Sequence, residues 1–170
     1  MNIRFLILWL AFGLLAAGGC SKAYELCCSK AYETKVLTDF NSSAEFSAFH
    51  TFAYSGMTDR GVEIGASDNK SPLRMRIKDM VNKQIAAKGL RQVGLEDRPD
   101  LLVHLSFGVN DIFADKYQEA TLIVNLAESS KKKVVWRAVI TETLGDDLEK
   151  NFEMADKGIA KAFKNYPPAK

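Results

Sequence analysis

The sequence predicts an α+β fold, an antiparallel β-sheet with two helices packed on one face. Three segments alternate apolar and polar side chains with a period of two, which indicates strands with one buried face: residues 100–111, 121–127 and 133–143. Two other segments repeat apolar residues at helical spacing, at residues 71–89 and 148–163. Because helices do not alternate strictly with strands along the chain, we expect antiparallel rather than parallel pairing.

The first part of the expected domain holds two short strands and a loop. Residues 36–40 form the first strand candidate, and residues 50–54 form the second at the end of an aromatic cluster. Asn41-Ser42-Ser43 carries turn-forming side chains between them. Residues 55–70 are polar and contain three glycines, so we predict a loop there.

A helix with one buried stripe is predicted after this loop. Ser71 suits the N-cap, and Pro72 suits the first helical position. Gly89 is expected to end the helix in the left-handed conformation, with Leu90 packing back against it. The apolar stripe consists of Leu73, Ile77, Met80, Val81 and Ile85.

The second part of the domain is predicted as a long strand, a hairpin and a final helix. The hairpin joins residues 121–127 to residues 133–143 through a short polar turn. Its second strand is expected to place four side chains on one face: Val134, Trp136, Ala138 and Ile140. Asp146 and Glu149 predict a capping box before the final helix, and Tyr166-Pro167-Pro168 is expected to stop that helix.

We expect one hydrophobic core between the sheet and both helices. The phase of the strands and the period of the helices place six large side chains in it: Trp136, Phe107, Leu105, Leu122, Ile77 and Phe152. Residues 36–170 are expected to form this single α+β domain, since a chain of roughly 150 residues can bury a sizeable core.

The start of the chain has the order of an export signal. Residues 1–4 are positively charged, residues 5–17 are almost entirely apolar, and small residues then precede Cys20. The apolar run is shorter than the ~20 residues that a transmembrane helix needs, which disfavours a retained anchor. The junction resembles a lipobox, so we predict a lipoprotein signal peptide at residues 1–19 and a diacylglyceryl group on Cys20. Cleavage without lipidation is the alternative, because Ala17-Gly18-Gly19 also has the small-x-small pattern of signal peptidase I.

Residues 20–35 are predicted as a flexible tether between the lipid and the domain. They are polar and contain a short tandem repeat, Cys20–Glu25 and Cys28–Glu33. Ser21 follows the predicted lipidated cysteine, and serine there does not resemble an inner-membrane retention signal. We therefore expect anchoring at the periplasmic face of a bacterial outer membrane, with the membrane as one partner.

Composition and residue types argue against several classes of function. The chain has 23 basic and 21 acidic residues, so nothing indicates nucleic acid as a partner. The three cysteines all lie at the front of the chain, outside the expected domain, so we expect no metal site and no cofactor. His50 and His104 are the only histidines, and neither belongs to a catalytic constellation. We therefore expect a protein that is not an enzyme and has no catalytic residues.

Two functions remain open from the residues alone. The first is a non-catalytic interaction module of the cell envelope, which meets an envelope protein or a cell-wall partner through a sheet edge or residues 55–70. The alternative is a periplasmic protein that binds a small molecule or a lipid in a pocket between sheet and helices. An open concave pocket lined by leucine, phenylalanine and tryptophan would favour the second function, and a filled core with an exposed strand edge would favour the first.

Several short motifs, taken in order, resemble a bacterial envelope lipoprotein family over residues 36–168. They are Asp39-Phe40, Glu45-Phe46, Phe49–Ala53, Ser71–Leu73, Lys88–Leu90, Pro99–Val103, Val135–Arg137 and Tyr166–Pro168. The family is that of the domain of unknown function numbered four-one-three-six. The resemblance implies an envelope lipoprotein with an α+β domain, and it implies no catalytic residues.

Overall fold

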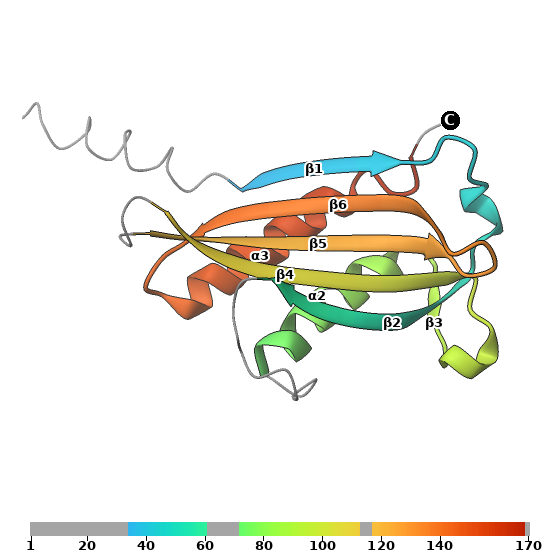
Figure 1. Ribbon diagram of the computed structural model, residues 1–170, viewed down its shortest axis with the longest axis horizontal. Helices are drawn as coiled ribbons and strands as arrows, with labels where there is room; N and C mark the ends of the chain where they lie inside the picture. The colour runs from blue at the N-terminus through green and yellow to red at the C-terminus, as the bar shows by residue number, and fades with distance from the viewer. Residues whose placement is uncertain (1–33, 61–71, 113–116, 169–170) are drawn as a thin grey trace, which may run out of the picture. The chain divides into compact units, whose positions relative to one another are not determined.

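The computed structural model describes residues 34–60, 72–112 and 117–168, which belong to one structural unit. Their helices and strands are, in chain order, β1 (Lys35–Phe40), β2 (Thr51–Arg60), α2 (Pro72–Ala87), β3 (Arg91–Gln92), β4 (Leu101–Ile112), β5 (Tyr117–Glu128), β6 (Lys133–Leu144) and α3 (Leu148–Phe163) (Figure 1). The connections also contain two short 3-10 helices, η3 (Phe46–Ala48) and η4 (Leu95–Asp97). The predicted signal peptide at residues 1–19 and most of the predicted tether lie outside the described residues.

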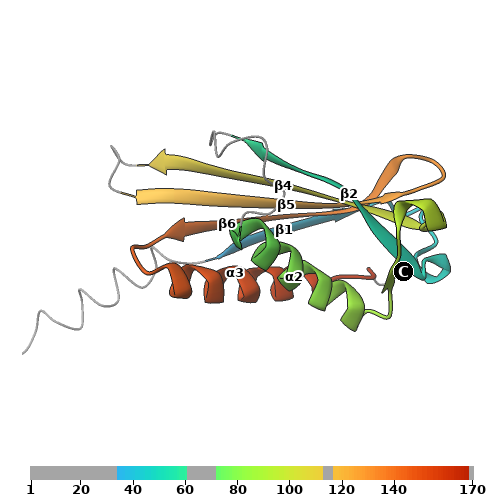
Figure 2. The same ribbon diagram turned by 90° about the horizontal axis from the view of Figure 1, so that it is seen from below.

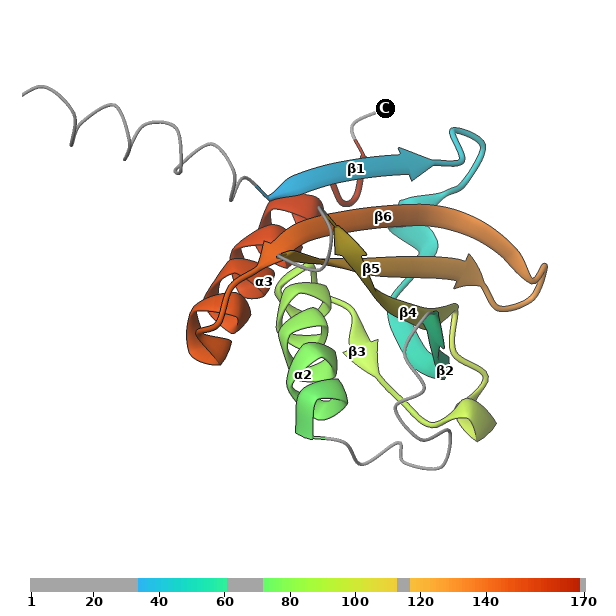
Figure 3. The same cartoon turned by 60° about the vertical axis from the view of Figure 1, so that its left-hand side comes forward.

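The strands form one six-stranded sheet in the order β1-β6-β5-β4-β2-β3. Both helices lie on the same face of this sheet (Figure 2), and they run side by side (Figure 3). β1 pairs antiparallel with β6, β6 with β5, and β5 with β4. The prediction of an antiparallel sheet is nevertheless only partly right, because β2 runs parallel to both β4 and β3. The reason is the helix α2, which carries the chain back along the sheet so that β4 starts at the same end as β2.

Strand β2 is longer than the sequence predicts. The predicted strand at residues 50–54 was expected to give way to a loop at residues 55–70, but the strand continues to Arg60 and remains paired with β4. A bulge between Tyr54 and Gly56 shifts the register of this pairing. Backbone pairing with β4 therefore keeps residues 55–60 in the strand, although their composition is typical of a loop. The rest of the predicted loop lies outside the described residues.

The boundaries of α2 agree with the sequence pattern. The helix starts at Pro72, and its predicted N-cap, Ser71, lies outside the described residues. Gly89 has a φ of 85°, the left-handed conformation predicted for it, and Leu90 is buried directly after it. The predicted end of this helix is therefore confirmed.

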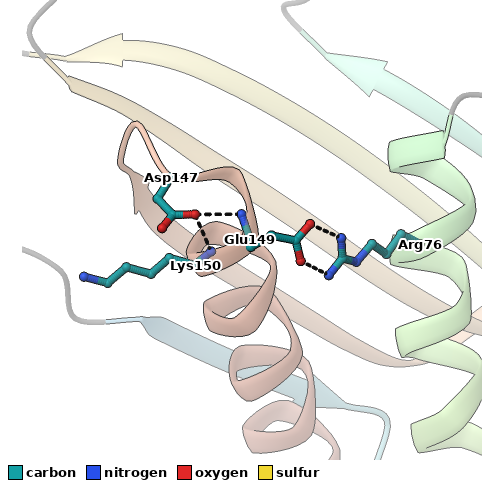
Figure 4. A network of polar contacts seen from close by, with 4 residues as sticks. All are labelled: Arg76, Asp147, Glu149 and Lys150. Atoms are coloured by element: carbon teal, nitrogen blue, oxygen red, sulfur yellow. Dashed lines mark hydrogen bonds and ion pairs between the residues drawn. The ribbon is translucent and has the colours of Figure 1, made fainter.

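The N-cap of α3 is Asp147 rather than Asp146, so the predicted capping box is wrong in its first residue. A carboxylate oxygen of Asp147 accepts hydrogen bonds from the backbone N–H groups of Glu149 and Lys150, at 3.0 and 3.2 Å (Figure 4). Both neighbouring aspartates carry the same capping group, and the extended backbone of Asp147 (φ −89°, ψ 105°) decides which one is used. The helix ends at Phe163, ahead of the predicted stop signal.

The predicted core is largely confirmed. Five of the six side chains are buried: Trp136, Leu105, Leu122, Ile77 and Phe152. Phe107 is half-buried and packs at the margin of the core. At the C-terminal end of α3, Phe163 and Tyr166 pack against the Trp136 ring, with centroid distances of 4.8 and 5.5 Å. One core therefore joins the sheet to both helices.

Val134 does not lie on the buried face that the sequence predicts for it. Its side chain is 39% exposed, whereas Val135 is 1% exposed. The register of β5 against β6 shifts here, because Trp136 pairs with Leu126 while Val134 pairs with Ala127. This bulge adds one residue to β6 and reverses the side of the sheet on which Val134 lies.

Replacing Phe152 with alanine is expected to lower the free energy of unfolding by about 3–5 kcal/mol, because a buried ring is lost and leaves a cavity. Phe40→Ala is the matched control, since the Phe40 ring is 45% exposed. It should cost less than about 1 kcal/mol. Urea unfolding followed by tryptophan fluorescence measures both changes. Equal losses in the two variants would contradict the placement of Phe152 in the core.

Candidate functional site

An apolar cavity of about 310 Å³ lies between the sheet and the two helices, and we call it the sheet–helix pocket. The helices contribute Leu73, Ile77, Leu148, Asn151, Phe152, Ala155 and Ile159 to its wall. Strands β4, β5 and β6 contribute Phe107, Val109, Gln118, Ala120, Leu122, Ile140, Glu142 and Leu144. Most of these side chains are apolar, so the pocket favours an apolar occupant.

Side-chain size explains why this space is open. Ala120 of β5 and Ala155 of α3 both line the pocket, and their single methyl groups leave volume that larger residues would occupy. Leu148, at the start of α3, is 61% exposed and fills little of it. At the other end of the helix, the rings of Trp136 and Phe163 fill the space between helix and sheet. The pocket therefore lies under the N-terminal part of α3.

Glu142 is a buried carboxyl in the wall of this pocket. Its side chain is 5% exposed, and the hydroxyl of Thr34 donates a hydrogen bond of 2.7 Å to Oε1. Burial raises the pKa of the Glu142 carboxyl above its usual range, while the hydrogen bond from Thr34 acts in the opposite direction. Glu142 therefore ionises less readily than an exposed glutamate, and it does so beside a mainly apolar cavity.

Gly158 allows α3 to approach the sheet closely beside Glu142. A Cβ atom at this position would lie 3.0 Å from Glu142 Oε1 and 2.8 Å from the Cγ2 atoms of Ile140 and Thr34. The two contacts of 2.8 Å are shorter than those real Cβ atoms make, so a larger residue here would require α3 or these side chains to shift. Gly158 therefore sets the distance between helix and sheet next to the pocket.

An ion pair joins the two helices beside the pocket. The guanidinium of Arg76 in α2 donates two hydrogen bonds, of 2.7 and 2.6 Å, to the carboxylate oxygens of Glu149 in α3 (Figure 4). The same guanidinium lies 3.9 Å from the centre of the Phe152 ring, which lines the pocket. The pairing holds the pKa of Glu149 below its usual range and raises that of Arg76. The bridge therefore holds α2 and α3 together over one wall of the pocket.

The residues singled out from the sequence do not meet at one site. Cys20 lies outside the described residues. His50 precedes β2, where its backbone N–H donates to Asp100, and His104 lies in β4; neither lines the sheet–helix pocket. Within the described ranges, no group of three or more histidine, cysteine, aspartate and glutamate side chains is placed to hold a metal ion.

Sequence reasoning missed Glu142, although a signal for it exists. The buried face of β6 contains Trp136, Ala138 and Ile140, and the same period of two then reaches Glu142. An acidic residue in phase with a buried face indicates an unusual environment, because a carboxyl is rarely buried without a partner. The sequence signal for Gly158 is weaker, because a single glycine inside a helical pattern only hints at close packing.

Residues 36–168 match the domain of unknown function DUF4136, and the chain belongs to this family. The family that the short motifs predict is therefore confirmed. No curated protein matches the chain. Of the helices in the described ranges, none has the length and apolar character required to cross a membrane.

Comparison with solved structures finds similar chains at low sequence identity. The chain is similar to a DUF4136 family protein from Bacteroides thetaiotaomicron, with 13% identity and a TM-score of 0.54, over 81% of this chain and 96% of that one. It is also similar to a PDZ domain protein from Parabacteroides distasonis, with 16% identity and a TM-score of 0.54, over 87% of this chain and 40% of that one. The PelC dodecamer from Paraburkholderia phytofirmans has 16% identity and a TM-score of 0.48, over 76% of this chain and 94% of that one. Similarity at these identities concerns the fold alone.

Glu142→Gln is expected to raise the free energy of unfolding at pH 7, because glutamine retains an acceptor for Thr34 and removes a carboxyl whose ionisation is opposed by burial. The folded pKa lies above the unfolded value of 4.5, so the stability due to this group is complete below pH 4.5 and is lost as the pH rises through the folded pKa. The difference between variant and wild type should therefore be smallest in acid and grow toward neutral pH.

Urea unfolding at a series of pH values measures this difference. Glu119→Gln is the control, because Glu119 lies in the neighbouring strand β5 and outside the wall of the pocket. A difference between wild type and Glu142→Gln that stays constant with pH would contradict the burial of an ionisable carboxyl at this position.

Proposed function

We propose that this protein is a lipoprotein at the periplasmic face of the outer membrane that binds an apolar small molecule or a lipid chain between its sheet and helices. The observation that carries the binding function is the open apolar pocket of about 310 Å³. Leucine and phenylalanine side chains line it, as expected for a binding protein, whereas Trp136 does not belong to its wall. No catalytic residue enters this proposal.

The size and lining of the pocket support an apolar ligand. Its volume lies at the lower end of the range of ligand sites, which is roughly 300–1,000 Å³. A mainly apolar wall offers water few hydrogen-bond partners, so an apolar ligand that displaces this water gains free energy. Phe107 and Phe152 contribute aromatic surface, which adds to the gain from removing an apolar ligand from water.

The proposed location rests on the first residues of the chain. A positive start, an apolar run and small residues before Cys20 support export and lipidation. One acyl chain binds a membrane only marginally, so stable anchoring requires the several chains expected on a mature lipoprotein cysteine. Ser21 supports sorting to the outer membrane. Residues 20–33 would then act as a tether that holds the binding domain close to the bilayer, because Thr34 and Lys35 belong to the folded domain.

A non-catalytic interaction module of the envelope is the second candidate, and strand β1 favours it. β1 is an edge strand of the sheet, paired on one side with β6. Leu37 and Phe40 on this strand are 71% and 45% exposed, which is unusual for large apolar side chains at a sheet edge. An extended segment of an envelope protein or a cell-wall partner could add to this edge.

Cys20→Ser is expected to release the protein from membranes into the soluble periplasmic fraction, because it removes the thiol that would carry lipid. Intact mass of the wild-type protein extracted from membranes should show a chain that starts at Cys20 and carries acyl groups. Cys27→Ser is the control, since a second cysteine of the same segment should not affect fractionation. A mature chain without acyl mass would contradict the proposed anchor.

Ala155→Phe is expected to weaken binding of the apolar fluorescent probe N-phenylnaphthylamine by at least about tenfold, because the ring would occupy the pocket. Ala86→Phe is the matched control, since Ala86 is exposed on α2 and does not line the pocket. Fluorescence titration of the soluble Cys20→Ser chain measures binding, and thermal unfolding checks that each variant is folded.

Equal binding by wild type and Ala155→Phe, or no binding by either, would contradict the pocket function. The edge of β1 would then be the surface to test. Capture of envelope proteins by the lipidated chain, compared with a Leu37→Asp variant, would show whether that edge holds a partner.

A further inference from the structure

We propose that Glu142 makes the sheet–helix pocket selective for amphiphiles with a positively charged, hydrogen-bond-donating end, such as alkylamines, over those that end in a carboxylate. This inference rests on the proposed binding function and names the class of ligand. It assigns to Glu142 the role of a specificity-determining residue.

Glu142 is the charged group in the pocket wall. Among the described residues that line the pocket, no other side chain is acidic or basic. Asn151 is occupied, because its amide accepts from the backbone N–H of Gly145 at 2.9 Å and donates to the carbonyl of the same residue at 2.8 Å. Gln118 is also engaged in an interaction of its own. Glu142 therefore dominates the electrostatics of the cavity.

This carboxyl accepts one hydrogen bond from the described residues, because the hydroxyl of Thr34 donates to Oε1 and no described residue donates to Oε2. A carboxylate oxygen that is withdrawn from bulk water and lacks a donor is costly, and a donor from a ligand would offset that cost.

The charges near the pocket favour a cation over an anion. Arg76, which lies against Phe152, donates two hydrogen bonds to Glu149 and is not a wall residue. A ligand carboxylate next to Glu142 would place two like charges together, and no described wall residue supplies a cation to compensate. An ammonium group would instead form a charge-assisted hydrogen bond with Oε2.

The remaining wall suits the apolar part of such a ligand. Leu73, Leu122 and Phe107 present hydrocarbon and aromatic surface from a helix and two strands. An alkyl chain gains free energy in proportion to the apolar area that it removes from water. Chain burial therefore supplies the general affinity, and Glu142 supplies the preference for one head group.

The test compares decylamine, decanol and decanoate, each below its critical micelle concentration, as competitors of N-phenylnaphthylamine at pH 7. The protein is the full mature chain with Cys20→Ser. We expect decylamine to displace the probe at a concentration at least about tenfold lower than decanoate, with decanol between them. In Glu142→Gln the ratio should fall below about threefold, whereas Glu119→Gln should keep the wild-type ratio.

A second measurement keeps the inference testable if Glu142→Gln does not fold. The wild-type preference for decylamine over decanol should disappear in acid, where Glu142 is protonated, because neither ligand titrates between pH 4 and pH 7 and no other described wall residue does. Equal displacement by all three ligands at pH 7 would overturn the role of Glu142 and leave the pocket function standing. Failure of every ligand to displace the probe, together with unchanged probe binding by Ala155→Phe, would overturn the pocket function itself.

Discussion

The packing of α3 against β6 is the constraint on which the rest of the structure depends. At Gly158 the helix comes so close to the sheet that a Cβ atom would collide with Ile140 and Thr34. At its C-terminal end the helix is fixed by the rings of Phe163 and Tyr166 against Trp136. Because these contacts fix the C-terminal part of the helix against the sheet, they also set the distance at which its N-terminal part crosses the sheet. The short side chains there, Ala155 among them, leave the pocket open.

The same packing creates the electrostatic character of the site. Glu142 continues the buried face of β6, and α3 covers it. Only Thr34 donates to it among the described residues, so burial dominates and the pKa of the carboxyl is raised. The ion pair of Arg76 with Glu149 lies outside the pocket wall and joins the helices without neutralising Glu142. Carboxyls with a perturbed pKa are concentrated at functional sites of proteins, and this is why Glu142 is a candidate for ligand recognition.

Local patterns predicted most elements and failed where distant segments decide the outcome. Gly89 needed only its own backbone freedom to end α2, and the alternation around Leu105 needed only the pleat of a strand. The extension of β2 to Arg60 depends on pairing with β4, which lies beyond an intervening helix. The bulge that exposes Val134 likewise depends on the register with β5. Neither partner can be read from the segment itself.

The sequence by itself determined the family, the phases of most strands and most of the core, because each follows from residue order or from a periodic pattern. It also predicts the export signal at residues 1–19. Only the tertiary structure decided the parallel pairing of β2 with β4, the choice of Asp147 as a cap, and the pocket. A pocket is the volume that side chains from five elements leave unfilled, so no single segment encodes it. The environment of Glu142 also depends on the tertiary structure. Thr34 and Gly158 of α3 pack beside it, although they lie near opposite ends of the domain in the sequence.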